Sequence, residues 1–169
     1  FATRDLTCLL TLGVVQGATA TTFDPGAAVT RMERGALLAR ALRQLGVPCP
    51  PVGSAFVDTA TSFARDDIAC LHWLGIANGI TPTLFGPELR VSRQELAALV
   101  ARTLRVFGTS CDVGPVPFTD LAASFAPDAI ACLYDLGVVR GVTETTFDPA
   151  APVTRQELAA ILARMLSPA

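Results

Sequence analysis

The chain has 169 residues with thirteen basic and fifteen acidic side chains, which give a formal net charge of −2. This near balance argues against a nucleic-acid-binding surface, which needs a basic stripe. Hydrophobic residues make up 51% of the chain, yet no run approaches the roughly 20 apolar residues of a membrane-spanning helix. All of the basic residues are arginine, whose planar guanidinium suits carboxylate and phosphate partners.

The sequence repeats itself with a step of 62 residues and without gaps. A [TS]-R-x-E motif stands at residues 30–33, 92–95 and 154–157, and each copy follows an F-x-P motif. Because the cysteines keep the same step, the register of the repeats is unambiguous.

This register divides the chain into three repeats, 1–49, 50–111 and 112–169. We expect the first repeat to be truncated at its N-terminus, since Phe1 corresponds to Phe63 in the second. We therefore expect the chain to be a fragment or a processed product of a longer protein. Each repeat is near the size at which a hydrophobic core of its own is marginal, so we expect the three to pack together.

In the middle repeat the pattern predicts, in chain order, a connector at 50–54, a loop at 56–58, a short helix at 66–74, a turn-rich loop at 79–87 and a longer helix at 92–106. The helices are indicated by apolar residues at helical spacing and by a glycine after each. No segment has the pattern of a strand. The predicted fold is mostly α, with two main helices in each repeat.

The five cysteines allow two regular disulfide pairings. One joins Cys49 to Cys70 and Cys111 to Cys132 and leaves Cys8 unpaired, whereas the other joins Cys8 to Cys49 and Cys70 to Cys111. Buried free thiols are a third reading. We favour the first pairing, because it ties each F-x-D loop to the helix that follows it. No cluster of cysteine and histidine has the spacing of a metal site, so we expect no metal.

The [TS]-R-x-E motif has a structural explanation for two of its positions. Its hydroxyl and its glutamate have the spacing of a capping box, which starts a helix. These capping residues are Thr30, Glu33, Ser92, Glu95, Thr154 and Glu157.

The arginine of the motif needs another explanation, because a cation at a helix N-terminus opposes the helix dipole. These arginines are Arg31, Arg93 and Arg155. A guanidinium beside free backbone N–H groups would form an anion site. Alternatively, each arginine forms an internal ion pair, for which Asp58 and Asp120 are the candidate partners.

Other residues could line a ligand-binding groove beside the motif arginines. Gln16, Asn78 and Arg140 each precede a glycine in the loop after the first helix. Trp73 could stack on a sugar ring. No nucleophile or carboxylate pair recurs with a histidine base, so we predict neither an enzyme nor a cofactor.

Taken in order, these residues resemble the S-layer homology domain family. The third repeat follows the whole family pattern, with F-x-D at 118–120, Phe125-Ala126, Gly137-Val138, F-x-P at 147–149 and the helix-start motif at 154–157. The resemblance implies a pseudo-threefold helical bundle of three repeats and a secreted location at the bacterial cell surface. The regular cysteines and the arginine bias look like an actinobacterial subgroup.

The resemblance also implies a function. Members of this family hold surface proteins on the envelope by binding an acidic, often pyruvylated, wall polysaccharide non-covalently in grooves between repeats. By this likeness the ligand contacts would be Arg31, Arg93 and Arg155, with Asp58 and Asp120 in the same grooves. The alternative is a structural or assembly module of a surface-layer or appendage protein, with contacts to other copies of the chain and no glycan ligand.

Overall fold

The computed structural model describes residues 7, 9–17, 19, 21–110 and 113–166. The chain divides into two compact units. Unit 1 consists of residues 1–90 and 154–169, and unit 2 consists of residues 91–153. The prediction of a mostly helical fold is confirmed, because the described residues form helices joined by loops and contain only isolated β-bridges.

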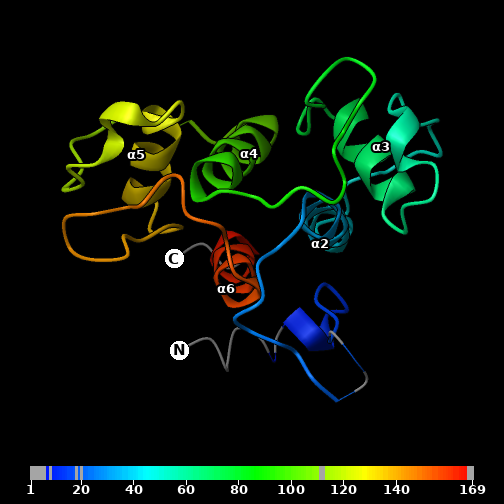
Figure 1. The fold of residues 1–169 in the computed structure, drawn as a ribbon, viewed down its shortest axis with the longest axis horizontal. Coiled ribbons are helices and arrows are strands. Elements are labelled where there is room, and N and C mark those ends of the chain that lie inside the picture. Colours follow the sequence, from blue (N-terminus) through cyan, green and yellow to red (C-terminus); the bar gives the residue numbers. More distant parts are fainter. Residues whose placement is uncertain (1–6, 8, 18, 20, 111–112, 167–169) are drawn as a thin grey trace. The chain divides into compact units, whose positions relative to one another are not determined.

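Unit 1 contains the helices α2 (Arg31–Gln44), α3 (Arg65–Trp73) and α6 (Arg155–Leu166) and the 3-10 turn η1 (Val57–Thr59). Helix α2 packs against both α3 and α6 (Figure 1). The second helix of repeat 1 therefore lies against the first helix of repeat 2, so a helix pair of this unit joins two repeats.

Unit 2 has the corresponding elements of the next repeats, namely α4 (Arg93–Val106), η2 (Leu121–Ala123) and α5 (Pro127–Asp135). Helix α4 packs against α5, as α2 packs against α3 (Figure 1). The core is built from the apolar side of these helices, including Leu96, Val100 and Ile130, together with the loop anchor Phe147.

The helix boundaries follow local sequence signals. The helix predicted at 66–74 begins and ends one residue earlier, and the helix predicted at 92–106 begins at Arg93 with Ser92 as its N-cap. Pro127 occupies the first position of α5, where its missing N–H costs no hydrogen bond. Gly75 and Gly108 follow α3 and α4 with φ values of 71° and 78°, a conformation that favours glycine.

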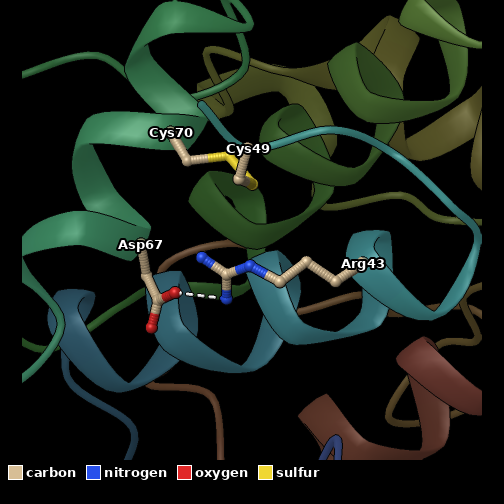
Figure 2. Close-up of a disulfide and its surroundings, with 4 residues drawn as sticks. All are labelled: Arg43, Cys49, Asp67 and Cys70. Atoms are coloured by element: carbon tan, nitrogen blue, oxygen red, sulfur yellow. Dashed lines mark hydrogen bonds and ion pairs between the residues drawn. A yellow bond between two sulfur atoms is a disulfide. The ribbon is translucent and has the colours of Figure 1, made fainter. Parts of the chain in front are cut away.

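The predicted disulfide between Cys49 and Cys70 is confirmed. It joins the connector after α2 to α3, with the two Cα atoms 5.2 Å apart (Figure 2). An ion pair between Arg43 Nη1 and Asp67 Oδ1, at 2.6 Å, links α2 to α3. Cys132 is disulfide-bonded as well. Cys111, its predicted partner, and Cys8 lie outside the described residues.

In the described part of the chain, no helix combines the length and the apolar character that crossing a membrane requires. Within the same residues, no group of three or more His, Cys, Asp or Glu side chains is placed to hold a metal ion.

Candidate ligand-binding groove

Each of the three long helices begins with a reciprocal pair of hydrogen bonds. At α2 the Thr30 N–H donates to Glu33 Oε2 at 2.8 Å, and the Glu33 N–H donates to Thr30 Oγ1 at 3.3 Å. The same pair of bonds recurs at α4 and α6, between Ser92 and Glu95 and between Thr154 and Glu157. The hydroxyl and the glutamate of the motif thus satisfy backbone groups at the helix start.

The next N–H groups of each helix bond to the F-x-P loop of another repeat. At α2 the N–H of Arg31 donates to the carbonyl of Leu89 at 2.8 Å, and that of Met32 donates to Pro87 at 3.0 Å. The corresponding acceptors are Ala151 and Pro149 for α4, and Ala27 and Pro25 for α6. The expectation of free N–H groups at these helix starts is therefore wrong, because carbonyls that sequence spacing does not reveal occupy the place of an anion.

The motif arginines hold the same loops with their side chains. Arg31 donates from Nε to the Phe85 carbonyl at 2.8 Å and from Nη2 to the Asn78 carbonyl at 2.9 Å. Its guanidinium also lies over the Phe85 ring, 4.6 Å from the centroid, and the residue is only 7% exposed. The partial negative charges of these carbonyls and of the ring face offset the unfavourable helix dipole.

The other two arginines repeat this arrangement. Arg93 donates to the carbonyls of Phe147 and Arg140 at 2.7 and 2.8 Å. Arg155 donates to those of Phe23 and Gln16, both at 2.8 Å. Repeat 1 thus reaches the loop of repeat 2, repeat 2 that of repeat 3, and repeat 3 that of repeat 1. Gln16, Asn78 and Arg140 take part through their backbone carbonyls.

Asp58 and Asp120 hold these loops from the other side. The Asp58 carboxylate accepts the N–H of Phe85 at 2.9 Å and that of Gly86 at 2.8 Å. Asp120 accepts the N–H groups of Phe147 and Asp148 at 2.9 and 2.7 Å. The loop phenylalanine is therefore fixed at its N–H by aspartate and at its carbonyl by arginine.

The position of Asp120 alters its titration. The hydrogen bond from the Phe147 N–H is the main cause that lowers the pKa of Asp120, with help from the Asp148 N–H and the charge of Arg93, while burial opposes the shift. A carboxylate that accepts backbone N–H groups is stabilised in its charged form. The charged form of Asp120 therefore holds the loop of repeat 3.

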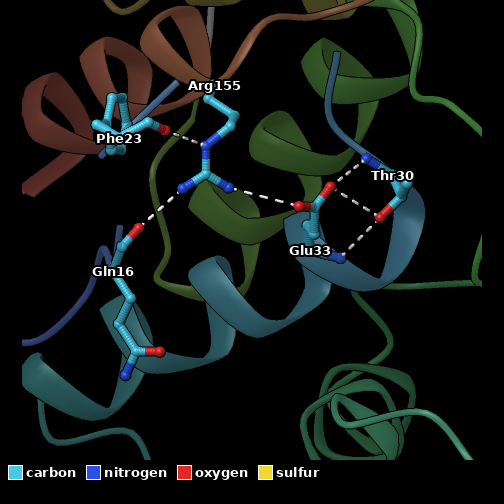
Figure 3. A network of polar contacts seen from close by, with 5 residues as sticks. All are labelled: Gln16, Phe23, Thr30, Glu33 and Arg155. Atoms are coloured by element: carbon cyan, nitrogen blue, oxygen red, sulfur yellow. Dashed lines mark hydrogen bonds and ion pairs between the residues drawn. The ribbon is translucent and has the colours of Figure 1, made fainter. Parts of the chain in front are cut away.

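A groove of about 400 Å³ opens in unit 1 beside Arg155. Figure 3 shows the guanidinium of Arg155 pointing towards Gln16, Phe23 and Glu33, with an ion pair of 3.4 Å between Arg155 Nη1 and Glu33 Oε1. The walls come from the loop of repeat 1, from α2 and from the side chains of Phe63 and Arg155. The residues that line the groove are Gln16, Gly17, Asp24, Ala27, Glu33, Ala36, Leu37, Arg40, Phe63 and Arg155.

The predicted site residues do not all meet in this groove. Arg155 and Gln16 line it, whereas Trp73, at the C-terminus of α3, is 56% exposed and is not part of the lining. The predicted residues of unit 1 that are likewise outside the lining are Arg31, Asp58 and Asn78. In unit 2, Arg93, Asp120 and Arg140 belong to the loop contacts described above.

Sequence reasoning missed three polar or aromatic residues of the groove, namely Asp24, Arg40 and Phe63. A signal for Arg40 was present, because Arg102 and Arg164 recur at the same 62-residue step. The helical spacing of Arg40 from the motif glutamate, seven residues, also places both on one side of α2.

A family model of the S-layer homology domain matches the chain in three segments, 3–33, 55–97 and 117–159. These segments cover more than half of the chain and contain all three [TS]-R-x-E motifs.

Curated relatives carry the same kind of region. An endoglucanase of Bacillus sp. (strain KSM-635) is 27% identical over 90% of this chain and 16% of its own length. The surface-layer 125 kDa protein of Lysinibacillus sphaericus is 25% identical over 98% of this chain and 14% of its own length. An S-layer protein of Bacillus thuringiensis subsp. finitimus is 25% identical over 92% and 19%, respectively. The chain spans less than a fifth of each of these relatives. It belongs to the S-layer homology domain family, the anchoring modules of proteins secreted to the bacterial cell surface.

Proposed function

We propose that the chain binds an acidic, pyruvylated wall polysaccharide non-covalently in the groove beside Arg155 and so anchors a larger protein to the cell wall. The observation that carries the proposal is the composition of the groove. It combines two guanidinium groups with the side chains of Gln16 and Asp24 and the exposed ring of Phe63.

These groups suit a charged sugar. A guanidinium matches a carboxylate with two parallel hydrogen bonds. Carboxylate and amide side chains accept and donate hydrogen bonds to hydroxyl groups, and an aromatic ring offers a flat apolar surface. The described lining has no histidine and no nucleophilic cysteine or serine, so its composition fits binding better than catalysis.

We infer a positioning role for the motif arginines in this function. Each of them fixes a loop phenylalanine, and in the groove the loop of repeat 1 forms one wall. A direct ligand contact by Arg31, Arg93, Asp58, Asp120, Asn78, Arg140 or Trp73 stays a prediction, as do the three repeat boundaries.

A groove-filling substitution tests the proposal. Ala27 lines the groove and is half-buried, so Ala27→Trp should occupy the space of a sugar. Ala55→Trp is the matched control, because Ala55 is exposed and outside the lining. Co-sedimentation would be measured with cell walls of the producing bacterium, both intact and chemically stripped of their acidic polysaccharide.

We expect the wild type and Ala55→Trp to sediment with intact walls only, and Ala27→Trp to bind at least tenfold more weakly. Equal binding by the two tryptophan variants would show that the groove is not the site. Equal sedimentation with stripped and intact walls would show that the polysaccharide is not the ligand.

The internal use of the motif arginines favours a second candidate, a structural or assembly module without a glycan ligand. In that case neither wall preparation would bind the chain. The oligomeric state, measured by sedimentation velocity over a range of protein concentrations, would then reveal association between copies.

A further inference from the structure

Arg155 already uses three of its five guanidinium N–H donors within the chain. They donate to the carbonyls of Phe23 and Gln16 and to the Glu33 carboxylate (Figure 3). Its side chain is 12% exposed. Since its charge is already opposed by that of Glu33, Arg155 is poorly placed to be the main partner of an incoming anion.

Arg40 is the other cation of the groove, and its guanidinium differs from that of Arg155 in its hydrogen bonds and ion pairs. It lies in the third turn of α2, lines the groove and is half-buried. In the part of the chain that the structure describes, Arg40 forms no hydrogen bond and no ion pair. Its neighbour Arg43, by contrast, is paired with Asp67. A guanidinium stays charged at any relevant pH, so Arg40 brings to the groove a positive charge that no described residue pairs with.

The helix geometry separates the charge of Arg40 from the ion pair of Glu33 and Arg155. Glu33, Ala36, Leu37 and Arg40 share one side of α2. Seven residues of α-helix place Glu33 and Arg40 roughly 10 Å apart along the axis. One end of the groove therefore holds the ion pair of Glu33 and Arg155, and the other end presents the Arg40 guanidinium, which has no partner among the described residues.

The groove also includes a ring with an uncommitted face. Phe63 is 65% exposed although it is a large apolar residue. An exposed ring at the wall of a groove can cover the apolar face of a sugar, because such contact removes apolar surface from water.

We propose that Arg40 is the residue that recognises the negative charge of the ligand, by a bidentate contact to a carboxylate group, while Phe63 covers the adjoining sugar ring. This assignment rests on the proposed polysaccharide function and specifies which residue gives it selectivity for acidic sugars. The motif arginine Arg155 acts in it as a positioning residue of the groove wall.

The test compares one polysaccharide in two chemical forms. Purified wall polysaccharide would be used as isolated and after reduction of its carboxyl groups to alcohols, with affinities measured by titration calorimetry on the whole chain. The variants are Arg40→Gln, which keeps a polar side chain, and Arg40→Lys, which keeps the charge without the fork. Arg65→Gln is the control, because Arg65 is exposed, carries the same charge and is outside the lining.

We expect the wild type and Arg65→Gln to prefer the native over the reduced polysaccharide by at least tenfold. Arg40→Gln should bind both forms with the affinity that the wild type has for the reduced form, and Arg40→Lys should lie between. Because Arg40 forms no internal bond in the described structure, its variants should melt within about 2 °C of the wild type, as surface substitutions do.

The outcomes separate the two proposals. If Arg40→Gln retains the full preference for the native polysaccharide, the role of Arg40 is refuted while the polysaccharide function stands. If the wild type binds neither form, the proposed function fails and the role of Arg40 fails with it.

Discussion

Replacing Arg31 by lysine should destabilise unit 1 although the charge is conserved. Arg31 is 7% exposed and forms two hydrogen bonds to carbonyls of another repeat, besides its contact with the Phe85 ring. A lysine ammonium cannot serve both carbonyls with this planar geometry. Losing one hydrogen bond to a charged group costs about 1.5–3 kcal/mol, and the weaker ring contact adds about 0.5–1 kcal/mol. We expect Arg31→Lys to lower the free energy of unfolding by about 2–4 kcal/mol.

Urea unfolding, followed by circular dichroism and by the fluorescence of Trp73, the one tryptophan of the chain, would measure this loss. Arg43→Lys is the matched control. Its ion pair with Asp67 is 41% exposed on the arginine side, so the same substitution there should change stability by less than about 1 kcal/mol. If Arg31→Lys is as stable as Arg43→Lys, the two carbonyl contacts of Arg31 do not stabilise the loop.

Three further predictions concern local features. Replacing Cys49 and Cys70 together by serine opens a link across 21 residues and should cost about 3 kcal/mol in urea unfolding. Ser92→Ala removes the N-cap of α4 and should cost about 1 kcal/mol by the same measurement. Because the pKa of Asp120 is lowered on folding, its charged form should stabilise unit 2 above the unfolded value of about 3.9, and this contribution is lost as the pH falls through the folded pKa. Asp120→Asn should therefore weaken the dependence of unfolding on pH at the acidic end of a thermal-melting series.

Each of these predictions has a contrary outcome. A serine double variant as stable as the oxidised wild type would show that the link does not restrict the unfolded chain. Full stability of Ser92→Ala would mean that a neighbouring group replaces the hydroxyl. An acid-melting slope unchanged in Asp120→Asn would assign that slope to other carboxylates.

The sequence predicted local structure better than contacts between repeats. Periodic apolar residues, Ser92 and Pro127 indicated helices because capping and helix-start preferences act within one turn. The pairing of Cys49 with Cys70 was one of several possibilities that the spacing left open. Arg155 bonds to carbonyls more than a hundred residues away, and carbonyls have no signature in the sequence. The role of its guanidinium therefore could not be derived from the motif.

The same limit explains the residues of the groove. Arg155 and Gln16 were expected there because they belong to motifs near glycine or a helix start. Arg40 and Phe63 come from the middle of α2 and from the loop before α3, and only folding brings them to one surface. Arg40, Arg102 and Arg164 recur at the 62-residue step, and only the folded structure shows that Arg40 differs from the other two in having no partner among the described residues.

The helix starts have a consequence for how such a protein can evolve and be engineered. A helix whose first two N–H groups donate to carbonyls of a different repeat does not fold independently of that repeat. Deleting one repeat would remove the carbonyl acceptors of a helix in one of the other repeats and, at the same time, the arginine that holds a loop in another. Insertion or loss of a single repeat should therefore destabilise two other elements at once, and we expect the three repeats to be inherited and transplanted together.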